Sequence, residues 1–128
     1  MSVVEDAPLL EAGQYDATIV EIDESKEPIE TTYKGTTTRE YKVDLTLEVE
    51  NNGDVHTLRR RMNRKATPKS SLRKTYRNVM GEDKSKFEIN DMLYKRCRVS
   101  VVLNPDRDGR MWSNIDEILG ASETTLED

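Results

Sequence analysis

An Asn52-Gly53 pair follows a stretch of alternating apolar and polar residues, and this constrains the fold more than any other feature of the sequence. Both central residues of a two-residue type I′ turn need a positive φ, which Asn and Gly adopt readily. Before the pair, residues 41–49 are apolar at every second position, as in a strand with one buried face. The sequence therefore predicts an antiparallel hairpin in which Asn51 lies opposite Asp54.

This register sorts the side chains of the predicted hairpin onto two faces. It forms apolar pairs on one face and polar pairs on the other: Leu47 with Leu58, Val43 with Met62, Thr46 with Arg59, and Asp44 with Arg61. Arg60 is the exception, because it falls opposite Leu45 on the apolar face. Either its stem lies along the core while its guanidinium reaches water at the mouth of a barrel, or the register is slipped.

The remaining patterns predict three more strands and one helix. The apolar positions of residues 15–23 change parity midway, which indicates a strand with a bulge. Residues 24–38 are polar, contain Pro28 and Gly35, and are interpreted as a long loop. Thr67 followed by proline predicts a helix start, Gly81 predicts its end, and residues 90–94 suggest a helical turn. Two further strands are expected at 97–103 and 111–119, joined by a turn at 104–109.

The predicted order is three strands, one helix and two strands (β-β-β-α-β-β). We therefore expect a mainly β protein, a five-stranded OB-type barrel with one helix between strands three and four. Residues 13–120 would form this domain, residues 1–12 an N-terminal arm, and residues 121–128 an acidic, disordered tail.

Several classes of function are disfavoured by what the sequence lacks. There is no glycine-rich phosphate loop, no nucleophile elbow and no His-Glu-x-x-His pair, so we predict a protein that is not an enzyme and needs no cofactor. One cysteine, Cys97, and one histidine, His56, cannot form a zinc cluster, and Cys97 is expected in the core. Residues 104–109 resemble the start of a calcium loop, but Ile115 stands where the bidentate Glu belongs, so a plain turn and no metal are predicted.

The charge distribution is the main indication of a ligand. The chain has a formal net charge of −5, yet residues 58–80 carry nine cations and no acid. A block of one sign creates a local potential that the overall charge hides. The block predicts nucleic-acid binding; in the alternative, Asp44, Glu48 and other acids cancel its field across the fold.

An OB-type domain would place this interface on strands two and three and on the flanking loops. Cations that follow a phosphate backbone, together with a few stacking rings, suit single-strand binding. Tyr15, Tyr41 and Tyr76 are assigned to the core, which leaves Tyr33 and Trp112 as candidates for stacking. The candidate binding residues are Arg59, Arg61, Arg64, Lys65, Lys69, Arg73 and Arg77 in the basic block, Tyr33, Lys34 and Arg39 in the first loop, and Arg107, Arg110 and Trp112 in the second.

The chain also resembles the small single-stranded-DNA-binding proteins of phages, a family of OB-type domains. The resemblance lies in four short segments: GQYDATI at 13–19, KSSLRK at 69–74, LYKRCRV at 93–99 and NIDEI at 114–118. Tyr94 stands where a Leu-Gly-Lys turn would have glycine. The resemblance implies the OB fold and a single-stranded DNA ligand, and it assigns no individual binding residue.

We therefore predict non-catalytic binding of single-stranded DNA in phage replication or recombination, with RNA as an alternative ligand. The competing interpretations are a protein-interaction module or phage accessory factor that binds no nucleic acid, and a structural component of a virion. The acidic end at 123–128 is interpreted as a frayed C-terminus or, alternatively, as a tail that recruits replication or recombination proteins, although it lacks the terminal Pro-Phe of bacterial tails. With no apolar stretch near about 18 residues, a cytoplasmic location without membrane contact is expected, in the host cell for a phage protein. Either a monomer or a homo-oligomer is compatible with the sequence.

Overall fold

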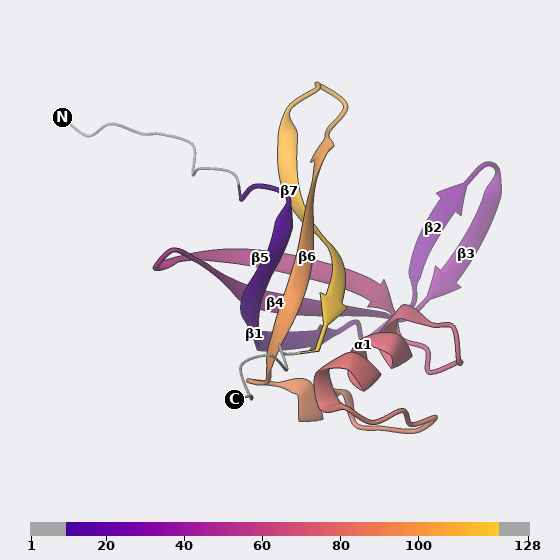
Figure 1. Ribbon diagram of the computed structural model, residues 1–128. Coiled ribbons are helices and arrows are strands. Elements are labelled where there is room, and N and C mark those ends of the chain that lie inside the picture. The colour runs from indigo at the N-terminus through magenta and orange to yellow at the C-terminus, as the bar shows by residue number, and fades with distance from the viewer. Residues whose placement is uncertain (1–9, 121–128) are drawn as a thin grey trace.

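A five-stranded antiparallel sheet forms the body of the protein (Figure 1). The computed structural model of the chain describes residues 10–120, so the predicted tail at 121–128 lies outside the described residues. The sheet has the strand order β5-β4-β1-β6-β7. Its strands are β1 (Gly13–Glu24), β4 (Lys42–Asn51), β5 (Asp54–Asn63), β6 (Arg96–Pro105) and β7 (Met111–Leu119).

The hairpin of β4 and β5 confirms the predicted register. Asn51 pairs with Asp54, and Asn52 and Gly53 have φ values of 52° and 89°, as the turn requires. Leu45 pairs with Arg60, so the slipped register is wrong. Arg60 therefore lies at an inward position of β5.

The bulge predicted in the first strand is also present. The pairing of β1 with β4 shifts between Ile19 and Glu21, so Val20 is the extra residue. A bulge bends its strand and increases the local twist. β1 is thereby able to pair with β4 along its second half and with β6 along its first half, and it forms the centre of the sheet.

The segment expected to be a loop is a second hairpin. It comprises β2 (Ile29–Tyr33) and β3 (Thr36–Glu40), which pair only with each other and project from the body (Figure 1). Lys34 and Gly35 turn the chain with φ values of 51° and 78°. Threonine favours extended backbone, and five threonines outweigh the breaker residues that suggested a loop. The predicted β-β-β-α-β-β order is therefore wrong, because two strands intervene between the first and second strands of the main sheet.

The main sheet is not a closed barrel. β5 and β7 lie close to each other, but no ladder of hydrogen bonds joins them. Instead, Nη1 of Arg60 donates one hydrogen bond of 3.2 Å to the carbonyl oxygen of Ile115 across the gap. A guanidinium on the inward face of β5 must keep access to water and cannot be packed like an apolar side chain. The expected closure is absent at this position, which is called the seam below.

Helix α1 (Ser71–Met80) packs against β5, β6 and β7. Its N-cap is Ser70 instead of the predicted Thr67, because the Ser70 hydroxyl accepts a hydrogen bond of 3.3 Å from the amide of Arg73. Thr67 belongs to a preceding turn, in which its carbonyl accepts from the amide of Ser70. Gly81 ends the helix with a φ of 79°, as predicted. A 3-10 turn, η1 (Ile89–Met92), confirms the expected helical turn before β6.

The core contains the apolar residues predicted for it, with one exception among the tyrosines. Tyr76 is buried and stacks on Phe87 with ring centroids 4.1 Å apart, and Tyr15 is partly buried against the core. Tyr41 is 44% exposed, so its assignment to the core is wrong: it lies between β3 and β4, outside the alternation of either strand. Cys97 is buried, and this burial raises the pKa of its thiol to about 12.

Leu10, within the segment expected to be an N-terminal arm, is buried in the core. Its amide donates to the hydroxyl of Ser113 on β7 at 2.9 Å, and the same hydroxyl donates to its carbonyl at 2.8 Å. No helix within residues 10–120 is long and apolar enough to cross a membrane.

Candidate nucleic-acid interface

The outer face of β4 and β5 carries two of the predicted binding residues in different settings. Arg61 forms a two-pronged pair with Asp44, with Nε–Oδ1 and Nη2–Oδ2 distances of 2.8 and 3.0 Å. These hydrogen bonds lower the pKa of Asp44 and raise that of Arg61. Arg59 has no hydrogen-bonded or ion-paired partner among residues 10–120 and reaches Asp44 only through space.

Carboxylates from β1 extend along this same outer face. In the sheet register, Glu21 lies opposite Thr46 and Asp23 lies opposite Asp44. Those two positions of β4 are in turn opposite Arg59 and Arg61. The face therefore carries acids on β1 and β4 beside the two guanidiniums of β5, and its potential is lower than the basic block alone predicts.

Two further predicted cations stabilise the base of the β2–β3 hairpin. Nε of Arg64 lies 2.8 Å from Oε1 of Glu24 at the end of β1, and Nζ of Lys65 lies 2.9 Å from Oε1 of Glu40 at the end of β3. Both pairs join the segment after β5 to strands far earlier in the chain. Their charges are already matched within the fold.

The cations of helix α1, together with Lys69 just before it, are only partly matched by acids. Nε of Arg73 lies 2.9 Å from Oδ1 of Asp83, and its Nη1 donates a hydrogen bond to the carbonyl oxygen of Ala66. The side chain of Arg73 is only 17% exposed. The hydrogen bond from Arg73 lowers the pKa of Asp83. Nζ of Lys74 lies 2.7 Å from Oε2 of Glu117 on β7. Lys69 and Arg77 have no ion-pair partner in the described part of the chain.

Five of the nine cations in residues 58–80 thus form ion pairs with acids from elsewhere in the described fold: Arg61, Arg64, Lys65, Arg73 and Lys74. Most of these pairs are exposed to water, where such contacts are weak and yield to competing charges. Acids therefore offset the charge of five cations in the block, as the alternative interpretation expects. The other four cations have no ion-pair partner within residues 10–120.

The tip of the β2–β3 hairpin combines an exposed ring with a cation. Tyr33 is 69% exposed, and Nζ of Lys34 lies 5.4 Å from the centroid of its ring. Nearer the base, Nε of Arg39 is 3.9 Å from Oε2 of Glu30 on the facing strand. Of the three residues predicted in this region, Tyr33 and Lys34 are thus brought together, and Arg39 faces an acid.

The tip of the β6–β7 hairpin repeats the same combination. Trp112 is 46% exposed, and the guanidinium carbon of Arg110 lies 5.0 Å from the centroid of its ring. Arg107 is exposed in the turn beside them. The predicted ring and cations of the second loop therefore share one tip, which projects from the sheet (Figure 1).

Asp106 organises this second tip, and sequence reasoning assigned it no such role. Its Oδ1 accepts hydrogen bonds from the amides of Asp108 and Arg110 at 2.8 and 2.9 Å, and its Oδ2 accepts from Nε1 of Trp112 at 2.8 Å. The hydrogen bond from Trp112, followed by those from the amides, lowers the pKa of Asp106. The sequence signal for this role was the preference of Asp for turns, in which its carboxylate accepts a hydrogen bond from the backbone amide two residues later.

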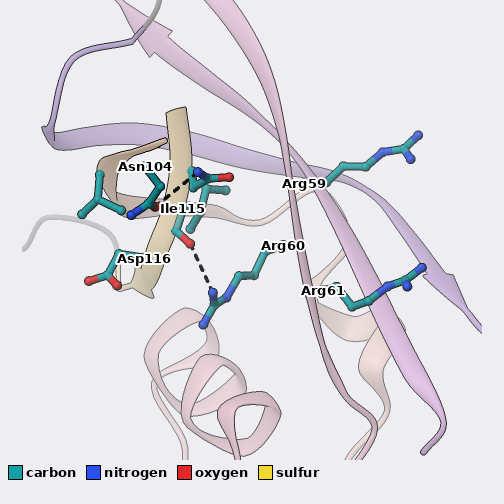
Figure 2. Close-up of a pocket in the computed structure, with 8 residues that line it drawn as sticks. Arg59, Arg60, Arg61, Asn104, Ile115 and Asp116 are labelled. Atoms are coloured by element: carbon teal, nitrogen blue, oxygen red, sulfur yellow. Dashed lines mark hydrogen bonds between the residues drawn. The ribbon is translucent and has the colours of Figure 1, made fainter. Parts of the chain in front are cut away.

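A polar hollow of about 350 Å³ lies between β5 and the β6–β7 hairpin (Figure 2). Figure 2 shows the side chain of Arg60 directed toward Ile115, while Arg59 and Arg61 point the other way. Asn104 and Asn114 lie on the hairpin wall, where the Asn114 amide donates to Oδ1 of Asn104 at 3.3 Å. The sequence showed that Arg60 lies at an apolar position of the hairpin, but it did not predict a binding role for this residue. Only the open seam provides the hollow that Arg60 lines.

No group of three or more potential metal-ligating side chains occurs among residues 10–120. The turn that resembles a calcium loop uses the carboxylate of Asp106 for the hydrogen bonds described above. A comparison of the chain with protein-family models and with curated proteins finds no match. The resemblance to phage single-stranded-DNA-binding proteins thus stays a prediction from the four segments quoted for it.

Proposed function

We propose that this protein is a non-catalytic OB-type domain that binds single-stranded DNA in replication or recombination. The five strands of the main sheet and helix α1 support the fold assignment, since three of these strands precede the helix and two follow it. In this assignment β2 and β3 are an extension of the loop between the first two barrel strands. The seam is the gap between β5 and β7, the two edge strands that would have to pair to close the barrel.

One observation carries the ligand assignment: two projecting hairpins each present an exposed ring beside a cation. Tyr33 with Lys34 and Trp112 with Arg110 are contributed by the two loops that flank the binding face of an OB domain. Unpaired bases stack on such rings whatever their identity, and nearby cations attract the phosphates. Base pairs inside a duplex do not offer free faces, so the arrangement favours single strands.

The test is a titration of a labelled, unstructured oligonucleotide and of the matching duplex, followed by fluorescence anisotropy at two salt concentrations. We expect saturable binding of the single strand, weaker binding of the duplex, and a loss of affinity at higher salt. Equal or tighter binding of the duplex at the same salt would contradict the proposal. A matching RNA strand in a parallel titration distinguishes the two nucleic acids.

The second candidate function is a protein-interaction module, and the ion pairs of the basic block favour it. A surface whose cations are matched by its own acids does not need a polyanion. The same titration separates the two candidates, because the module predicts no saturable, salt-sensitive binding of any oligonucleotide.

A further inference from the structure

The hollow at the seam offers a guanidinium with unused donors. Arg60 is half-buried, and its only hydrogen bond among the described residues goes to the carbonyl oxygen of Ile115. A guanidinium has five N–H donors in a planar fork, so four of those of Arg60 have no acceptor within residues 10–120. Such a fork suits a planar ligand with two neighbouring acceptors.

The surroundings of Arg60 do not select a phosphate. Arg59 and Arg61 line the hollow but point away from it, and Arg61 is matched by Asp44 (Figure 2). Asp116 also lines the hollow, and it lies beside Arg60 in the adjoining smaller hollow as well. With Arg61 matched by Asp44 and the charge of Arg60 offset by Asp116, the remaining cation, Arg59, points away from the hollow, whereas binding a phosphate group calls for an excess of positive charge directed toward it.

The hollow instead matches a neutral, planar group that carries both donors and acceptors. Asn104 and Asn114 add amide groups that can donate and accept, and Val102 contributes to the small apolar part of a mostly polar lining. A volume of about 350 Å³ lies within the ordinary range for small-ligand sites. A single nucleobase has this combination of flat apolar faces and a polar edge.

Guanine fits the polar groups best among the four bases. Its O6 and N7 are neighbouring acceptors that arginine binds with both prongs, and its N1 and N2 groups are donors for a carboxylate such as that of Asp116. In a single strand all edges of a base are accessible. Trp112 lies on the same face of β7 as Asn114 and two residues before it, so it can stack with the neighbouring base.

We infer that the seam hollow holds one unpaired guanine of a bound strand, with the fork of Arg60 on its O6 and N7. This inference rests on the proposed single-strand binding and adds a preference for one base. The outer face and the hairpin tips bind without regard to sequence, while the seam recognises a base edge.

The experiment compares a 15-residue thymine oligonucleotide with the same strand carrying one central guanine. We expect the parent protein to bind the guanine strand about tenfold more tightly, as a bidentate contact provides. Arg60→Lys keeps the charge but loses the fork, so it should bind both strands equally. Arg96→Lys is the matched control, since Arg96 pairs with Glu50 away from the seam, and it should keep the preference.

A second variant, Asn114→Ala, covers the case in which Arg60→Lys does not fold, because Asn114 is exposed and lies on the opposite wall of the hollow. We expect it to reduce the preference at least threefold. Equal binding of both strands by the parent, or a preference that survives in folded Arg60→Lys protein, overturns the inference. A single adenine or cytosine that binds as tightly as guanine overturns it too.

Guanosine and thymidine 5′-monophosphates separate this inference from the proposed function. We expect the guanine nucleotide, and not the thymine nucleotide, to shift the NMR signal of the Arg60 side-chain N–H. Binding of strands without any base preference would support the proposed function and contradict the guanine site at the seam. A shift by the guanine nucleotide without binding of any strand removes the proposed function and keeps the hollow as a guanine site.

Discussion

The basic block at 58–80 and the two hairpin tips both contain cations predicted to bind nucleic acid, but the fold places these cations in different surroundings. In the block, five of nine cations form ion pairs with acids on β1, β3, β4, β7 and the loop after α1. At the tips, Lys34 and Arg110 lie beside exposed aromatic rings. A cation that is paired at short range contributes little to the potential that a ligand meets.

A run of cations in sequence thus measures neither accessibility nor binding. Most of the cations in the block form ion pairs with distant segments, as Arg64, just after β5, does with Glu24 at the end of β1. The tips offer little net charge but supply the faces on which bases stack. If the protein binds a single strand, the rings should therefore matter more than the count of cations.

The largest expected effect comes from removing both rings. Tyr33→Ala with Trp112→Ala should weaken single-strand binding by roughly 30-fold or more, because stacking contributes about 1–3 kcal/mol per base. Anisotropy titrations at constant salt measure the change. Tyr94→Ala is the control, since Tyr94 is 71% exposed but belongs to neither hairpin tip. A double variant that binds like the parent would show that the tips are not the contact surface.

A smaller effect should separate unpaired from paired cations within the basic block. Arg59→Ala removes an unpaired cation, so the log–log salt slope should fall by about 0.7 and the affinity several-fold. Arg64→Ala removes a cation matched by Glu24 and should change the slope by less than half as much. Similar slope changes for the two variants would mean that the ion pairs open on binding and that paired and unpaired cations contribute equally to it.

A gain in affinity is expected when an acid of the outer face is neutralised. Asp44→Asn releases Arg61 from its pair, so single-strand binding should strengthen by about threefold at low salt and less at high salt. Asp54→Asn, at the β4–β5 turn and without an ion-pair partner within residues 10–120, is the control for the change in net charge. A loss of affinity in Asp44→Asn would instead indicate that the pair positions Arg61 for its contact.

The smallest effect concerns the pH dependence of the second tip. Because the fold lowers the pKa of Asp106 from its ordinary value of 3.8, the ionised carboxylate stabilises the tip above that pH. This contribution is lost as the pH falls through the lower folded-state pKa. We expect the fluorescence of Trp112, the single tryptophan, to change only below about pH 3.8. Asp106→Asn should abolish this transition, and a midpoint above pH 4 would contradict the assignment.

Features that depend on neighbouring residues could be predicted from the sequence alone. The register from Asn51 to Met62, the bulge near Val20 and the end of the helix at Gly81 follow from alternation and from backbone preferences. These signals act over a few residues, so they need no knowledge of distant parts of the chain. The β2–β3 hairpin was missed because Pro28 and Gly35 are typical of both loops and hairpin turns.

The sequence by itself thus determined the strands of the main sheet, the burial of Cys97 and the exposure of Tyr33 and Trp112. Only the tertiary structure decided which cations are free, because their acidic partners lie far away in sequence, as Glu24 does from Arg64. It also decided the open seam, where Arg60 donates a hydrogen bond across the gap to the carbonyl oxygen of Ile115. Ion pairs and gaps between edges depend on where distant segments meet in space, and that meeting is fixed by the packing of the whole core.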